Sequence, residues 1–193
     1  MQRLNLCFLP YPLLLIALLL GSCNGGNIQA THTDISSVTP FRLSSPDFTN
    51  ESMIPALYTC DSTNISPELH WNNPFTDAAT FALIMDDPDV PTQPWVHWIV
   101  YNIPATDTTL PPQFPIDSTV NGIEQGFTSF RITGYGGPCP PDGMHRYYFK
   151  LYALDSKLNS PARLTKSQLF SAMKGHILAE ADLMGKYIRK KST

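Results

Sequence analysis

Residues 95–104 read WVHWIVYNIP, a run rich in β-branched and aromatic residues that Pro104 ends. This composition favours a β-strand, and a proline cannot continue the ladder of backbone hydrogen bonds. Two more runs of this kind lie at 80–85, where the sequence DDPD stops the run, and at 145–155. The 18 prolines of the chain argue against an all-helical protein, because proline inside a helix removes a hydrogen bond. The sequence therefore predicts a mostly β protein with short strands joined by loops.

Length and composition indicate one globular domain. The chain has 193 residues, of which 42% are hydrophobic and 15% are charged. These values exclude a disordered chain and allow a core that needs no metal for its stability. The formal net charge of −3 offers no broad positive surface. We therefore expect no nucleic-acid partner, and an anionic ligand must be held locally by a few groups.

The first residues resemble a bacterial lipoprotein signal. Residues 1–22 carry one charge, Arg3, and an apolar run at 13–20 that is too short to span a bilayer. The run ends in the sequence LGSC, which is similar to a lipobox and makes Cys23 the expected lipidation site. The alternative is an ordinary secretory signal with an incidental cysteine. Residues 23–37 then form a flexible tether, and residues 38–193 form the folded domain. The domain would be attached to a membrane of the bacterial cell envelope and would face the periplasm or the exterior.

Two cysteines remain in the folded domain once the signal is removed. Cys60 and Cys139 would lie in an oxidising compartment, where paired thiols form disulfides. We therefore expect a Cys60–Cys139 bridge. The alternative is two separate buried cysteines that pack as small hydrophobic residues.

Weaker patterns complete the expected elements. Residues 41–44 alternate as in a strand, residues 56–60 are a second candidate strand, and residues 105–122 form a long connection. Near the C-terminus, Thr165 and Gln168 form a capping-box pattern. Apolar residues follow at helical spacing, namely Leu169, Met173, Ile177 and Leu178. Gly175 is a candidate break in this helix and Gly185 its expected end, which leaves residues 187–189 as a short strand.

Strand periodicity places polar residues at one end of the sheet. One face of the strand at 95–101 carries Trp95, His97, Ile99 and Tyr101, and one face of the strand at 145–153 carries His145, Tyr147, Phe149, Leu151 and Ala153. Both faces begin polar and become apolar. If the strands share a sheet, their polar ends form the mouth of a cavity whose floor is the core.

Two connecting segments supply further candidates for this site. Asp87 and Asp89 follow the strand at 80–85, and Pro88 biases Asp87 towards an extended conformation. The loop at 134–141, GYGGPCPP, combines glycines with prolines, and free amides at Gly136, Gly137 and Cys139 would be available to an oxyanion. Each motif alone is most often a turn, a core residue or a loop. Their convergence at strand ends favours a site.

The same blocks resemble the phosphatidylethanolamine-binding protein family, and most of all its bacterial branch of Raf kinase inhibitor-like proteins. The resemblance runs in order over residues 38–190, through the motifs DPDVP at 87–91, WVHWIVYNIP at 95–104 and GYGGPCPP at 134–141 with HRY at 145–147. It implies two packed antiparallel sheets with small peripheral helices and an anion pocket at one end. The pocket positions would be Asp87, Asp89, Trp95, His97, His145 and Tyr147. Animal members have Ser-Gly where this chain has Pro-Cys at 138–139, so inhibition of an animal kinase does not carry over.

These features favour a binding or regulatory protein over an enzyme. The expected ligand is a phosphate-like or carboxylate group on a lipid headgroup, a phosphorylated small molecule or a protein partner, which the protein would capture and so inhibit. The histidines can donate hydrogen bonds as imidazole or imidazolium. A hydrolase of small esters or phosphoesters that uses Asp and His is the alternative, although no Gly-x-Ser-x-Gly motif is present. The spacing matches no standard zinc site, and we expect neither a metal nor a cofactor.

Overall fold

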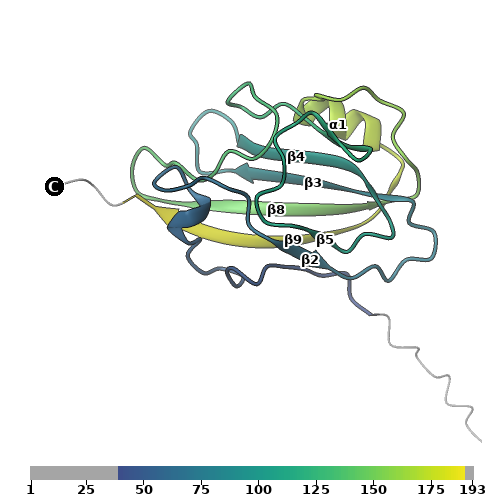
Figure 1. Ribbon diagram of the computed structural model, residues 1–193, viewed down its shortest axis with the longest axis horizontal. Coiled ribbons are helices and arrows are strands. Elements are labelled where there is room, and N and C mark those ends of the chain that lie inside the picture. Colours follow the sequence, from purple (N-terminus) through teal and green to yellow (C-terminus); the bar gives the residue numbers. More distant parts are fainter. Residues whose placement is uncertain (1–38, 190–193) are drawn as a thin grey trace, which may run out of the picture. The chain divides into compact units, whose positions relative to one another are not determined.

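The computed structural model describes residues 39–189, shown as coloured ribbon in Figure 1. The predicted signal segment at 1–22, the lipidation of Cys23 and the tether at 23–37 fall outside these residues and remain predictions. In the part of the chain that the structure describes, no helix is long and apolar enough to cross a membrane.

Two antiparallel sheets form the protein, as the sequence predicts. The larger sheet has the order β6-β7-β4-β3-β8-β9 and the smaller one β1-β2-β5. The large sheet consists of β6 (Thr119–Val120), β7 (Ile123–Gln125), β4 (Trp95–Pro104), β3 (Thr80–Asp87), β8 (Met144–Leu154) and β9 (Ile177–Ile188). The small sheet consists of β1 (Leu43–Ser44), β2 (Leu69–Trp71) and β5 (Thr109–Leu110). Within residues 39–189, the remaining elements are a short 3-10 helix, η1 (Ala56–Tyr58), and one α-helix, α1 (Lys166–Met173).

Strand β3 lies at the centre of the packing because both of its faces are buried. Phe81, Leu83 and Met85 join the main core, which combines side chains of both sheets. Ala82 and Ile84 join a second core that includes α1. All eight residues of β3 are buried, which explains its continuous apolar run. In Figure 1, β3 lies between β4 and β8, and α1 lies beside β4.

The predicted capping box at the start of α1 is confirmed. The Thr165 side chain accepts a bond from the Gln168 backbone, and the Gln168 side chain accepts one from the Thr165 backbone. Leu169 and Met173 are buried against the sheet, as their spacing predicts.

The predicted continuation of this helix to Gly185 is wrong. The helix ends at Met173, Gly175 turns the chain at a φ of +84°, and residues 177–188 form β9, which pairs with β8 along its length. Gly185 therefore lies inside a strand, where a Cβ atom would come within 2.4 Å of the Ile54 side chain. Its glycine marks a close approach between segments instead of a helix end.

The candidate strand at 56–60 is also wrong. Ala56–Tyr58 form η1, with the amides of Tyr58 and Thr59 bonded to the carbonyls of Pro55 and Ala56. These local bonds satisfy the backbone, so the segment does not pair with a sheet.

A β-bulge alters the predicted face of β4. Met85 pairs with Trp98 and Asp86 pairs with Val96, so His97 is the extra residue of the bulge. Its ring contacts that of Tyr147, on the side of the main core, whereas Ile99 and Tyr101 pack on the other side with α1. The predicted single face from Trp95 to Tyr101 is therefore wrong, because the bulge interrupts the alternation. The predicted face of β8 is confirmed, since Tyr147, Phe149, Leu151 and Ala153 all join the main core.

Candidate functional site

A cavity of about 270 Å³ lies where β3 ends and β4 and β8 begin. These strand ends are at the left of Figure 1. Six of the predicted site residues line the cavity, together with residues from the β3–β4 and β7–β8 connections. The lining consists of Asp87, Val90, Pro91, Trp95, His97, Phe130, Cys139, Pro140, Pro141, His145 and Tyr147. Residues far apart in the sequence thus meet at one end of the large sheet, because antiparallel neighbours alternate their starts and ends there.

Asp87 and His145 form a buried pair in this cavity. His145 Nδ1 lies 2.7 Å from Asp87 Oδ2, and the two side chains are 10% and 3% exposed. The other carboxylate oxygen accepts a bond of 2.8 Å from the backbone amide of Asp89. The turn after β3 therefore fixes the carboxylate, and the carboxylate fixes the imidazole so that its Nε2 is left for a ligand.

His97 is held by the loop at 134–141. Its Nδ1 lies 2.5 Å from the carbonyl oxygen of Gly136, and its own carbonyl accepts the Gly136 amide at 2.9 Å. Because a carbonyl only accepts, Nδ1 carries the proton and donates it. Burial lowers the pKa of His97, although the Gly136 carbonyl and Asp87 act in the opposite direction. Its Nε2 is then an acceptor near neutral pH, so His97 does not supply the imidazolium donor that the sequence suggested.

Tyr147 brings an unpaired hydroxyl to the site. The side chain is buried, and its Oη has no hydrogen-bond partner among the described residues. Burial raises the pKa of Tyr147, as does the Asp87 carboxylate nearby, while the Cys139 amide acts in the opposite direction. A buried polar atom without a partner is costly, so this hydroxyl is a group that a ligand could satisfy.

The loop at 134–141 uses two of its three predicted amide donors within the protein. The Gly136 amide binds the His97 carbonyl, and the Gly137 amide donates to Asn64 Oδ1 at 2.9 Å. The Cys139 amide has no bond to another described residue, which makes it the one of the three that is available to a ligand. Asn64 was not predicted. The sequence signal that could have indicated it is an asparagine in the polar turn at 61–64, since asparagine tolerates the left-handed conformation that Asn64 adopts, with a φ of +60°.

The predicted disulfide joins this loop to the segment after η1. Cys60 and Cys139 are bonded, with their Cα atoms 5.4 Å apart. The Cys60 amide also donates to the Pro138 carbonyl at 3.1 Å. No backbone hydrogen bond joins residues 139–143 to another described residue, so the disulfide is what holds the cavity wall beyond Pro138.

Asp89 is directed away from the cavity. Its Oδ2 accepts bonds from the Arg146 backbone amide at 2.9 Å and from Arg146 Nε at 3.0 Å. The bonds to Arg146 lower the pKa of Asp89. Its function in this geometry is to hold the turn that positions Asp87 against the start of β8.

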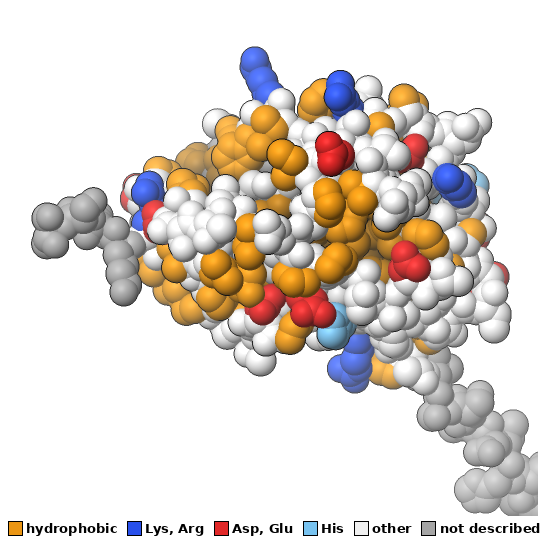
Figure 2. Space-filling model, in the orientation of Figure 1, with side chains coloured by type: hydrophobic (Ala, Val, Ile, Leu, Met, Phe, Trp, Pro, Cys, Tyr) orange, Lys and Arg blue, Asp and Glu red, His pale blue; other side chains and the backbone are white. Residues whose placement is uncertain are grey.

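An aromatic wall completes the cavity. The Phe130 ring lies 5.4 Å from those of both Trp95 and His97, in edge-on geometry. Phe130 is 40% exposed, and hydrophobic side chains gather over this end of the sheet in Figure 2. Sequence reasoning missed Phe130 and Val90 because they lie in connections without periodicity. The segment at 126–133, GFTSFRIT, also contains Phe127 and Ile132, so its composition does not single out Phe130.

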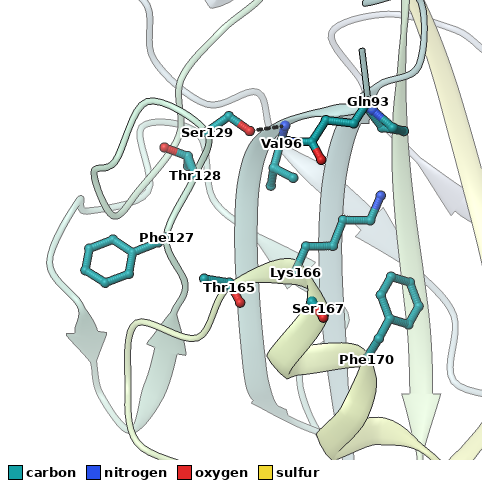
Figure 3. Close-up of a pocket in the computed structure, with 10 residues that line it drawn as sticks. Gln93, Val96, Phe127, Thr128, Ser129, Thr165, Lys166, Ser167 and Phe170 are labelled. Carbon is teal, nitrogen blue, oxygen red and sulfur yellow. Dashed lines mark hydrogen bonds between the residues drawn. The ribbon is translucent and has the colours of Figure 1, made fainter.

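A second cavity, of about 470 Å³, lies beside the start of α1 and is shown in Figure 3. It contains none of the predicted site residues. Lys166, on its wall, is ion-paired with the buried Asp86, which also lies 3.6 Å from Lys150 Nζ. Asp86 thus attaches α1 to the sheet while its neighbour Asp87 faces the first cavity. Within residues 39–189, no group of three or more His, Cys, Asp or Glu side chains is placed to hold a metal ion.

Known proteins are similar to this chain in sequence and in fold. A UPF0098 protein of Methanothermobacter thermautotrophicus is 45% identical over 143 residues, which are 74% of this chain and 95% of that protein. A crystal structure of a phosphatidylethanolamine-binding protein homologue of Chlamydia trachomatis is 39% identical, with a TM-score of 0.72, and the match covers 78% of this chain and 98% of the other. The crystal structure of Escherichia coli YbcL, described as a new member of the mammalian family, is 30% identical, with a TM-score of 0.73 over 79% of this chain and all of that one.

The predicted family is confirmed by these matches. The family of phosphatidylethanolamine-binding proteins matches residues 44–188, which include every strand that contributes to the cavity. This chain therefore belongs to the phosphatidylethanolamine-binding protein family.

Proposed function

We propose that this protein binds a small oxyanion, phosphate-like or carboxylate, in the cavity at the end of β3. The observation that carries the proposal is the buried Tyr147 hydroxyl, which has no partner among the described residues and lies beside the unbonded Cys139 amide. Both groups can donate a hydrogen bond to an oxygen of a ligand. The family name gives a phospholipid headgroup as one source of that oxyanion, and a phosphorylated small molecule or protein is another.

The proposed role is binding and regulation outside the cytoplasm. The LGSC motif at 20–23 supports attachment of the protein to a bacterial membrane through a lipid on Cys23. A binding protein at that place would capture a headgroup or a phosphorylated partner and so inhibit what that partner does. The cavity is small, which suits one charged group better than a whole lipid.

Titration calorimetry with methyl phosphate at pH 6 tests this proposal. The wild-type protein should bind with a stoichiometry of one, and Tyr147→Phe should weaken binding about fivefold, since one neutral hydrogen bond contributes about 1 kcal/mol. Tyr187→Phe is the matched control, because its hydroxyl donates to Asp61 at 2.7 Å outside the cavity. Absence of binding to the folded wild-type protein would contradict the proposal.

The Asp87–His145 pair also supports hydrolysis of small esters as a second candidate function. A carboxylate that fixes one imidazole nitrogen leaves the other to act as a general base on water. Turnover of p-nitrophenyl acetate or p-nitrophenyl phosphate that His145→Ala abolishes would favour this candidate. We expect binding without turnover, because no serine or threonine lines the cavity within the described residues.

A further inference from the structure

The cavity is unusual for an anion site because its fixed groups are mainly acceptors. Within the described residues, no lysine or arginine lines it, while Asp87 contributes a buried carboxylate. Arg146, the nearest cation along β8, is engaged with Asp89 outside the cavity. A dianion entering this space would meet a negative charge without a matching positive one.

The tautomer of His97 adds another acceptor. Its Nδ1 donates to the Gly136 carbonyl at 2.5 Å, and its Nε2 has no partner among the described residues. The titratable groups around the ring are Asp86 and Asp87 from β3 and His145 and Tyr147 from β8. Burial outweighs the carboxylates and lowers the pKa of His97, so the ring remains neutral near pH 7. Nε2 therefore requires a donor from the ligand.

The Tyr147 hydroxyl and the Cys139 amide are two donors that have no hydrogen-bond partner among the described residues and are available to the oxygens of a ligand. A phosphomonoester with one proton fits this set, because its P–OH group can donate to His97 while its other oxygens accept from the two donors. We propose that the site selects the protonated, singly charged form of a phosphomonoester, and that His97 Nε2 recognises this form by accepting a hydrogen bond from its P–OH group. This inference rests on the proposed function and specifies the protonation state of its ligand.

The pH dependence of binding distinguishes selection of the protonated phosphomonoester from oxyanion binding in general. A phosphomonoester has its second pKa near 6, so its singly charged fraction falls from about one half at pH 6 to about 1% at pH 8. The dissociation constant for methyl phosphate should therefore rise about 50-fold over this range. Methylphosphonate has a higher second pKa, so its decline in affinity should begin at a correspondingly higher pH. Dimethyl phosphate carries one charge but no P–OH group, and it should bind much more weakly than methyl phosphate at pH 6.

His97→Asn is the variant that removes the Nε2 acceptor and keeps the donor to Gly136. The asparagine amide can take the place of Nδ1–H and donate to the Gly136 carbonyl, but it has nothing in the place of Nε2. We expect at least tenfold weaker binding of methyl phosphate at pH 6 and a loss of the steep pH dependence. His176→Asn is the matched control, since His176 is paired with Asp155 outside the cavity and should leave both properties unchanged. Thermal unfolding of each variant confirms that it is folded.

Three results would overturn the inference while the proposed function stands. These are equal affinity for methyl phosphate from pH 6 to pH 8, equal binding of dimethyl phosphate, and a decline with methylphosphonate at the same pH as with methyl phosphate. The last result would place the proton on the protein instead of the ligand. Failure of the wild-type protein to bind any of the three probes would instead overturn the proposed function itself.

Discussion

Removal of the Tyr147 hydroxyl should weaken ligand binding but stabilise the fold. Its hydroxyl is buried without a partner, so the folded protein bears the cost of removing it from water. Tyr147→Phe should raise the free energy of unfolding by about 1 kcal/mol. Tyr135→Phe should lower it by a similar amount, because the buried Tyr135 hydroxyl donates to the Tyr58 carbonyl at 2.7 Å. Urea denaturation of the two variants would contradict this account if both changes had the same sign.

His97 should make the stability of the fold depend on pH. Burial lowers its pKa, so the unfolded chain takes up a proton below about pH 6.5 that the folded protein does not. The stabilising effect of neutral His97 is present above that pH and is lost as the pH falls towards the folded pKa, by up to about 1.4 kcal/mol per pH unit. Urea denaturation from pH 7.5 to pH 5 measures this slope. His97→Asn should flatten it, and an unchanged slope would assign the effect to other groups.

The loop at 134–141 is the element whose shape depends on one covalent bond. The Cys60–Cys139 bridge closes a loop with a sequence separation of 79 residues, and chain entropy alone gives it a contribution of about 4 kcal/mol. Cys139 is exposed and also lines the cavity, so a reductant can reach it. Replacement of both cysteines by alanine should lower the free energy of unfolding by up to that amount.

The same double variant should also weaken ligand binding. Residues 139–143 have no backbone hydrogen bond to another described residue, so loss of the bridge should make the prolines that line the cavity more mobile. His97 stays in place through its bonds to Gly136, so binding should be weakened rather than abolished. Calorimetry with methyl phosphate on the folded variant measures the change. Unchanged affinity would show that the wall does not need the bridge.

The sequence predicted the strands at the centre of the sheet well and those at its edge poorly. Strands β3, β4 and β8 contain buried runs rich in β-branched and aromatic residues, which predict a strand from the local sequence alone. In β9 none of the first four residues is buried, and Gly175 and Gly185 resemble the glycines that end helices. Its identity as a strand depends on pairing with β8, which is a contact over sequence distance and leaves little local signal.

The site was predictable where strand ends determine it. Asp87, His97, His145 and Tyr147 follow from their places in three long strands, and the structure brings them together in one cavity. The orientations were not predictable. The bulge at His97 depends on the register between β3 and β4. The bonds that use the amides of Gly136 and Gly137, and the bonds of Asp89 to Arg146, depend on partners more than 30 residues away.

At the scale of the molecule, the two faces of the large sheet give the adjacent carboxylates of Asp86 and Asp87 different functions. Asp86 faces the second core and forms ion pairs with Lys150 and Lys166, which attach α1. Asp87 faces the cavity and holds His145. Because neighbouring residues of a strand point to opposite faces, one short motif serves both the packing of the fold and the proposed binding site.

The proposed attachment to a membrane belongs to the whole chain and is tested apart from the cavity. Cys23 follows the apolar run at 13–20 and two small residues, an arrangement that resembles a lipobox. In a bacterial host fed a labelled fatty acid, Cys23→Ser should abolish labelling and move the protein from the membrane fraction to the soluble fraction. Cys7→Ser is the matched control, since Cys7 lies within the predicted signal and should leave labelling unchanged.

The released variant should retain its cavity. The core and the cavity are formed within residues 39–189, so removal of the lipid should leave the thermal unfolding midpoint and the affinity for methyl phosphate as they are in the wild-type protein. Continued labelling of Cys23→Ser would contradict the assignment of the lipid to this residue. Loss of labelling together with loss of affinity would contradict the independence of the two parts, and would mean that the segment before residue 39 contributes to the binding site.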